Sequence, residues 1–245
     1  MDSGYYAALT GLVARTQALD TAAANLANAQ TAGYRAEREY FRSALLGPDA
    51  LDSQLGRTVN DFGLLGGDRL SMAQGALALT GNPLDLAIEG EGFFQVQTPN
   101  GLRYTRDGNF HRTPGGLLVA ADGATVLSVT GKPIPVPPGD PSVGANGALS
   151  VAGGVVATIG VFKFPSGADL TPEGSNRYVA ASGVEPKATN ESAIHQGAIE
   201  QANQDVIQGS LDLMMMQRQA EMMQRALTIF HTEFNKTATE DLPKV

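Results

Sequence analysis

The chain has 245 residues, with 17 basic and 25 acidic side chains, a formal net charge of -8 and no cysteine. The missing cysteine excludes disulfide scaffolds, thiol nucleophiles and cysteine-ligated zinc or iron–sulfur sites. The acidic balance and the scattered basic residues give no electrostatic basis for binding nucleic acid. At about 150 residues per domain, the length corresponds to one or two domains.

The start of the chain lacks the basic segment and apolar core of a secretory signal peptide. Nowhere does the sequence hold a run of about 18 apolar residues that would span a bilayer. We therefore expect neither a cleaved leader nor membrane insertion.

Glycine and proline divide the chain into parts. Residues 1–46 hold 3 glycines and no proline, residues 192–245 hold 2 glycines and 1 proline, and the remainder lie between. Because both residue types disfavour helix interiors, the two ends are expected to be helical. We assign 1–46 and 192–245 to an axial helical domain, 47–70 to an extended connector and 71–191 to an antiparallel β-domain, which makes an α+β fold.

An apolar stripe marks the N-terminal segment as a helix of roughly residues 3–28. Leu12, Leu19 and Leu26 recur every seven residues. Tyr5, Leu9, Thr16 and Ala23 flank them.

The C-terminal segment carries a heptad pattern. One position of the heptad is occupied by Ile199, Val206, Leu213, Ala220, Leu227 and Phe234, and the other by Met216, Met223 and Phe230. The pattern favours a coiled coil with the N-terminal helix and with neighbouring subunits. The alternative is that the stripe is ordinary internal packing with no role in assembly. A helix over 194–239 would be about 70 Å long, more than one small β-domain covers. Five of the seven methionines fall at 214–216 and 222–223, where their adaptable side chains suit several slightly different neighbours.

The middle of the chain predicts antiparallel strands in a sandwich or partial barrel. The expected strands lie at 84–88, 92–98, 102–106, 125–129 and 155–164, and the expected turns at 99–101, 106–109, 113–116, 121–124 and 146–148. Five prolines in 132–141 indicate a stiff loop or an edge. The connector is expected to be extended, with Tyr34, Tyr40, Phe41 and Phe62 as anchors over 29–70.

We find no catalytic or metal-binding constellation in the sequence. His111, His195 and His231 lack metal-ligand spacing. Glu89 and Glu91 could be read as a glycosidase pair, but Gly90 and Gly92 favour a bulge or a turn there. No cofactor or metal is expected.

Two segments resemble signatures of the bacterial flagellar rod and hook proteins. The first runs from Ala24 to Arg35 and includes Asn25, Leu26, Asn28, Thr31, Gly33 and Tyr34. The second runs from Thr80 through Ala121-Asp122-Gly123 and includes Gly81, Asn82, Leu84, Asp85, Gly90, Gly92, Phe93 and Phe94. The C-terminal heptad helix, preceded by 198–203, is similar to the closing helix of the family.

The resemblance implies a structural axial subunit of the flagellar basal body rather than an enzyme. It implies assembly with copies of itself and other rod proteins, torque transmission, a share in the wall of the export channel, and export through the flagellar apparatus without a cleaved leader to a rod across the periplasm. Within the family the chain is closest to proximal rod subunits, with the distal type as the alternative. A non-flagellar adhesin or binding module is a further alternative.

The assembly interface is predicted on the two helical stripes. Its residues are Leu12, Leu19, Leu26, Val206, Leu213, Met216, Ala220, Met223, Leu227, Phe230 and Phe234. Because much of this surface would lack partners in an isolated subunit, we expect the terminal segments to be partly disordered before assembly and the β-domain to fold independently.

Overall fold

The computed structural model describes residues 2–42, 64–165, 170–181 and 183–236. These residues divide into two compact units. One unit holds both long helices and a two-stranded sheet, and the other is built from strands. Two helical arms and a central antiparallel β-domain are therefore confirmed.

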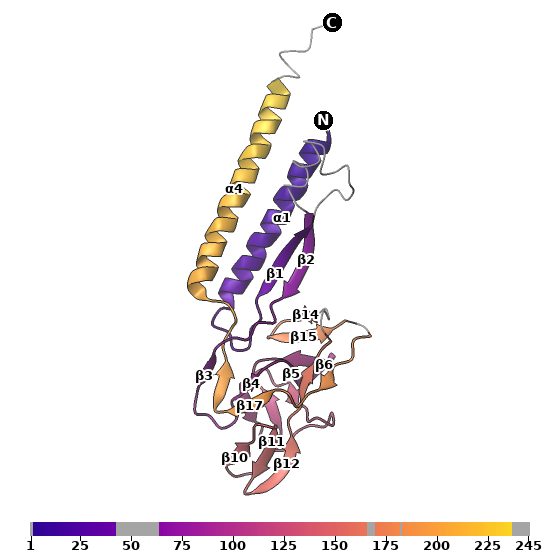
Figure 1. Ribbon diagram of the computed structural model, residues 1–245, viewed down its shortest axis with the longest axis vertical. Helices are drawn as coiled ribbons and strands as arrows, with labels where there is room; N and C mark the ends of the chain where they lie inside the picture. The colour runs from indigo at the N-terminus through magenta and orange to yellow at the C-terminus, as the bar shows by residue number, and fades with distance from the viewer. Residues whose placement is uncertain (1, 43–63, 166–169, 182, 237–245) are drawn as a thin grey trace. The chain divides into compact units, whose positions relative to one another are not determined.

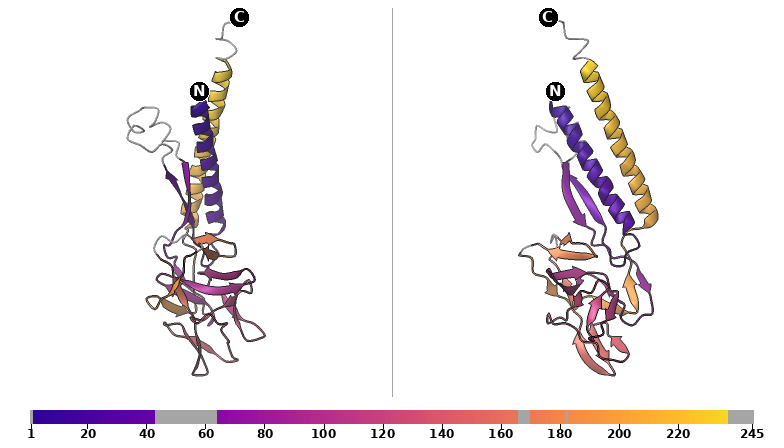
Figure 2. Two further views of the ribbon diagram at one scale, coloured as in Figure 1. Left: turned by 90° about the vertical axis from the view of Figure 1, so that its right-hand side faces the viewer. Right: turned by 180° about the vertical axis from the view of Figure 1, so that it is seen from behind.

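The helical unit contains α1 (Asp2–Ala27) and α4 (Val206–Lys236), which lie side by side (Figure 1). Two strands, β1 (Glu37–Arg42) and β2 (Leu64–Leu70), pair into a sheet, and β1 contacts α1 (Figure 2). The guanidinium of Arg69 lies over the Tyr40 ring at 4.8 Å. The helix expected over 3–28 is confirmed almost to the residue.

The buried face of α1 differs from the predicted leucine stripe. Gly11, Ala14 and Ala18 are buried, whereas Leu12 and Leu19 are half-buried. Each of these leucines directly follows a buried small residue. The buried face is therefore rotated by one residue, about 100° around the helix axis, from the predicted leucine stripe. Small side chains let two helix backbones approach closely, and this favours their burial over that of leucine.

On α4 the deeper residues do follow the heptad. Ala220 is buried, and Leu213, Met216, Met223 and Leu227 are half-buried. Val206 is exposed. The side chains of Phe230 and Phe234, also predicted at this interface, lie outside the described part of the structure.

The heptad helix starts later than predicted, and the assignment of 192–205 to it is wrong. Residues 193–196 and 198–200 form β17 (Ala193–Gln196) and β18 (Ala198–Glu200), which pair with strands of the β unit. Gly197 turns the chain between them at φ +73°. Ile194 is buried in the core of that unit, so local helical periodicity is outweighed by strand pairing and burial.

The β unit comprises Asn28–Ala36 and Leu70–Asp205. Its remaining strands are β3 (Leu77–Leu79), β4 (Leu86–Glu89), β5 (Phe93–Thr98), β6 (Gly101–Thr105), β7 (Phe110–Arg112), β8 (Leu118–Ala120), β9 (Thr125–Val126), β10 (Pro141–Val143), β11 (Ala148–Val151), β12 (Gly154–Thr158), β13 (Val161–Lys163), β14 (Leu170–Pro172), β15 (Arg177–Ala180) and β16 (Lys187–Ala188).

The largest sheet of this unit has the order β14-β15-β6-β5-β9-β8-β7, with β13 pairing both β5 and β16. A three-stranded sheet, β10-β11-β12, and the pairs β17-β4 and β18-β3 complete it. The described pairings within this unit are antiparallel. The antiparallel prediction is thus confirmed.

Two apolar clusters form the core of the β unit. The larger cluster contains Phe94, Phe110 and Ile134. The smaller cluster is mainly aromatic, and the rings of Tyr104 and Phe164 meet edge to face with their centroids 4.8 Å apart. Ile134 lies in the proline-rich stretch, which makes isolated bridges at Pro133 and Pro135 and enters the edge strand β10 at Pro141, as expected for a loop or an edge.

Four of the expected turns, 99–101, 113–116, 121–124 and 146–148, join paired strands, whereas 106–109 connects β6 to β7, which do not pair with each other. Gly101 joins β5 to β6 and Gly123 joins β8 to β9, both at positive φ. The single strand expected over 155–164 is split into β12 and β13, because the chain breaks at Gly160, where a Cβ would lie 2.5 Å from the Phe162 ring.

The connector lies mostly outside the described residues. Residues 47–63 and the expected anchors Phe41 and Phe62 have no described side chains. Residues 64–70 are extended, as expected, and form β2, which pairs with β1.

Candidate functional site: the motif segments on the β unit

The first motif is tied to the second at Gly33. Its φ is +69°, and a Cβ at this position would lie 2.3 Å from the Asp107 backbone nitrogen. The Gly33 N–H donates to the Glu200 carbonyl at 2.7 Å. Glycine is required here both by the backbone conformation and by the close approach of a second chain segment.

Three buried charges meet beside Gly33. Glu200 forms ion pairs with Arg35 at 3.0 Å and with Arg106 at 2.9 Å, and each of the three side chains is at most 3% exposed. Arg106 also donates to the carbonyls of Ile88 and Gly90. One carboxylate therefore joins the segment after α1, the end of β6 and the segment before α4.

Burial is the largest cause of the pKa shifts of both arginines. It lowers the pKa of Arg106 to about 10, an effect that Glu200 partly offsets and Arg35 reinforces. Burial likewise lowers the pKa of Arg35. Because arginine side chains keep their charge in proteins, the cluster carries a net positive charge that carbonyl oxygens and the ring of Phe93, 5.4 Å from Arg106, help to offset.

Asn203 ties the same segments a second time. Its Oδ1 accepts from the Ala36 N–H at 2.7 Å, and its Nδ2 donates to the carbonyls of Ser71 and Ala73 at 2.9 and 2.8 Å. Its own N–H donates to the Tyr34 carbonyl. The chain entering α4 and the chain leaving α1 are therefore both hydrogen-bonded within the β unit.

The asparagines of the first motif organise the end of α1. The side-chain amide of Asn25 exchanges two hydrogen bonds with the backbone of Glu37, at 2.8 and 2.9 Å. The backbone carbonyl of Asn28 accepts a hydrogen bond from the Thr31 N–H, and its Oδ1 accepts one from the Thr31 hydroxyl. These two hydrogen bonds close the turn after the helix. Leu26 is half-buried.

The second motif is a turn followed by core strands. The Asn82 amide donates to Asp85 Oδ1 at 2.8 Å, and Leu84 packs against the larger core. Gly81 and Gly90 have positive φ. Phe93 and Phe94 point into the aromatic and the larger cluster, respectively, and a Cβ on Gly92 would lie 2.6 Å from Val161.

Sequence reasoning missed Arg35, Arg106, Glu200 and Asn203. Arg35 and Arg106 stand inside the two motifs, but no spacing in the sequence brings them to Glu200. One signal in the sequence could have drawn attention to Glu200. It is an acidic residue directly after Ile199, which occupies a heptad position of the predicted helix.

The weak catalytic candidates are separated in the structure. Glu89 pairs with His195, and Glu91 with Lys163 at 2.7 Å; both carboxylates are exposed. Among the described residues no group of three or more His, Cys, Asp or Glu could hold a metal ion. Within the described part, no helix has the length and apolar character needed to cross a membrane.

The fold and the site define a structural protein, in which both chain segments that continue into the helices are held on a β-domain by buried polar contacts. Residues 6–35 match the family "Flagella basal body rod protein", and residues 87–151 match "Flagellar hook protein FlgE/F/G D1 domain".

Relatives cover nearly the whole chain. "Flagellar basal-body rod protein FlgF" of Mesorhizobium japonicum is 35% identical over 90% of both chains, and that of Caulobacter vibrioides is 33% identical over 100% of both. "Flagellar basal-body rod protein FlgG" of Bacillus subtilis is 28% identical over 91% of this chain and 93% of its own.

The chain belongs to the flagellar basal-body rod protein family. It is a structural rod subunit of the proximal type and not an enzyme.

Proposed function

We propose that the subunit assembles by pairing α1 and α4 as a coiled coil and packing them against copies of itself and other rod subunits, so that the helices line the export channel. The observation that carries this proposal is a second apolar face on α4. Leu211, Met214, Met222 and Ile229 are 46%, 51%, 62% and 62% exposed.

This exposed face recurs at helical spacing and lies apart from the half-buried heptad positions. Large exposed apolar patches mark interaction sites. Methionine adapts to slightly different neighbours, as packing against several kinds of rod subunit requires. Contacts between unlike faces of identical subunits generate an open helical array.

The buried polar cluster supports a role in transmitting torque. Arg35, Glu200, Arg106 and Asn203 hold both helix-linked segments on the β unit, so load entering the β unit reaches two covalent connections to the helices. The segment 29–70, which includes the connector, is proposed to stiffen the rod between axial neighbours.

Export through the flagellar apparatus without a cleaved leader, to a rod in the periplasm, is part of the same proposal.

Met222→Asp tests assembly through α4. The side chain is 62% exposed, so we expect the purified chain to keep its circular dichroism and thermal unfolding while cells lose rods and motility. Gln224→Asp, also at an exposed position of α4, is the matched control and should leave assembly intact. Leu213→Asp, on the half-buried heptad face, should also block assembly. Normal basal bodies from the Met222→Asp strain would contradict the proposal.

A further inference from the structure

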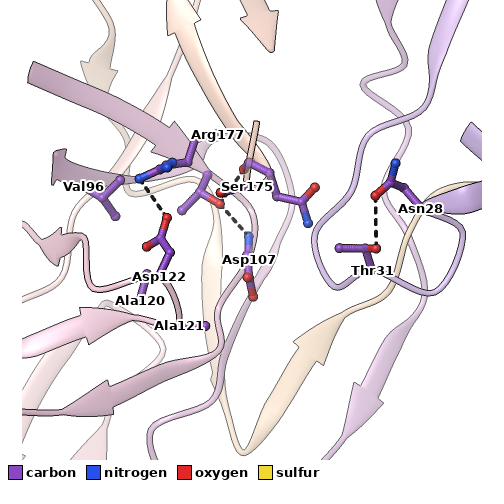
Figure 3. A pocket seen from close by; sticks show the side chains of 11 residues that line it. Asn28, Thr31, Val96, Asp107, Ala120, Ala121, Asp122, Ser175 and Arg177 are labelled. Carbon is purple, nitrogen blue, oxygen red and sulfur yellow. Dashed lines mark hydrogen bonds and ion pairs between the residues drawn. The ribbon is translucent and has the colours of Figure 1, made fainter. Parts of the chain in front are cut away.

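A cavity of about 210 Å³ lies within the β unit, where the first motif meets two turns of the sheet (Figure 3). Its walls include Asn28 and Thr31 from the segment after α1, Asp107 from the end of β6, Asp122 from the β8–β9 turn, and Asn176 and Arg177 from the start of β15. It is partly open to solvent, and its lining combines these polar side chains with apolar ones, among them Val96 and Ala120.

The fixed charges in this cavity do not balance. Asp122 and Arg177 form an ion pair at 2.8 Å. Asp107 accepts a hydrogen bond from the Asn109 N–H at 3.0 Å, but within the described part of the chain it makes no ion pair. The lining therefore carries one negative charge in excess.

Asp107 is also partly withdrawn from water. Burial raises its pKa, and the nearby carboxylates of Asp122 and Asp85 raise it further, while hydrogen bonds from Asn109 act in the opposite direction. A desolvated carboxylate surrounded by other carboxylates is stabilised by a cation placed beside it.

We propose that this cavity receives one basic side chain, lysine or arginine, from a neighbouring axial subunit. The inference rests on the proposed function, because that function places the subunit among other axial subunits. A single positive charge neutralises the cavity, and its ammonium or guanidinium group donates to the Asp107 carboxylate.

Size and ligand chemistry both favour a side chain. Small-molecule sites usually measure about 300–1,000 Å³, so this cavity is small for a free ligand and suits one long side chain. A divalent metal is disfavoured, since the described residues offer no group of three or more ligands for it. Arg177 already places a guanidinium against a carboxylate in the same cavity.

The first test uses the isolated full-length chain and L-argininamide as the probe. We expect saturable changes in the amide NMR signals of Asp107, Asn109 and Asp122, and binding about tenfold weaker in Asp107→Asn. Asp140→Asn, at an exposed position outside the cavity, is the matched control and should bind as the parent does. Equal binding by Asp107→Asn would overturn the assignment of the site.

The second test asks what occupies the cavity in the rod. Because the chain has no cysteine, Ala121→Cys places a unique thiol at the cavity, and a crosslinker joins it to a nearby lysine or arginine in purified basal bodies. We expect a link to a basic residue of another axial subunit, lost when Asp107→Asn is added. Ser142→Cys, exposed on β10, is the control.

Different results would contradict the cavity proposal and the proposed function. If mass spectrometry finds the chain in basal bodies but Ala121→Cys yields no such link, the cavity proposal is wrong and the rod function stands. If the chain is absent from basal bodies, the proposed function itself is wrong.

Discussion

The β unit buries large aliphatic and aromatic side chains such as Phe94 and Phe110, whereas the buried apolar side chains described in the helical unit are Ala14, Ala18 and Ala220. Alanine permits close helix packing but removes little apolar surface from water. From this difference we propose that the β unit has a core sufficient for its own stability, while the helical unit obtains much of its stability from neighbouring subunits.

Hydrogen exchange of the monomer gives the largest expected contrast. Amides of β5 should exchange only on global unfolding of the β unit, whereas amides in the middle of α4 should exchange about a thousandfold faster. The measurement is mass spectrometry or NMR on the verified monomer. Equal protection of α4 and β5 would show that the two units do not differ in stability in the monomer.

Glu200→Gln should produce the next largest effect, confined to the β unit. The substitution leaves two buried arginines without their carboxylate, and we expect a loss of about 3–5 kcal/mol in the free energy of unfolding, measured by urea denaturation. Glu91→Gln removes an exposed ion pair with Lys163 and serves as the control, with little change expected. Similar stability of the two variants would show that the buried cluster does not hold the motif segments.

Gly33→Ala sharpens the role of the first motif. We expect a loss of about 3 kcal/mol, because the new Cβ combines backbone strain with a clash against the Asp107 backbone. Gly81→Ala is matched, with a similar φ of +77° and no atom within 4 Å of the added Cβ, and should cost about 1 kcal/mol. Thermal unfolding of both variants measures the difference, and equal losses would mean that only the backbone conformation matters.

Asp107→Asn has the smallest expected effect, and it is stabilising in the isolated chain. A raised pKa means that the folded state binds this proton more tightly than the unfolded state does. The contribution of Asp107 to stability is therefore full at low pH and is lost as the pH rises from the ordinary value of 3.8 through the raised one. The variant should be more stable than the parent at pH 7, with a gain that shrinks toward pH 4 in urea titrations. Lower stability at pH 7 would contradict the unbalanced charge in the cavity.

Local patterns in the sequence predicted much of the fold. The span of α1, the hairpins at Gly101 and Gly123 and the break-prone proline stretch follow from helix propensity, from positive φ and from the missing proline N–H. The same reasoning extended the heptad through Ile199 into a strand, because the pairing of β18 with β3 joins residues far apart in the sequence.

The candidate site was predictable only in part. Gly33, Asn82 and Gly92 stand in motifs, and the structure supplies the close contacts that require them. Glu200 and Asn203 could not be assigned, since their partners at Arg35, Ser71 and Arg106 are brought near by folding alone.

The sequence by itself determined that two helical arms flank a hairpin-rich β-domain, because helix breakers and turn residues act on their immediate neighbours. Only the tertiary structure decided that α1 buries Ala14 and Ala18 rather than its leucines, and that one carboxylate holds two arginines from distant segments. Close backbone approach and the neutralisation of buried charge depend on what lies across the contact, and no local pattern specifies that partner.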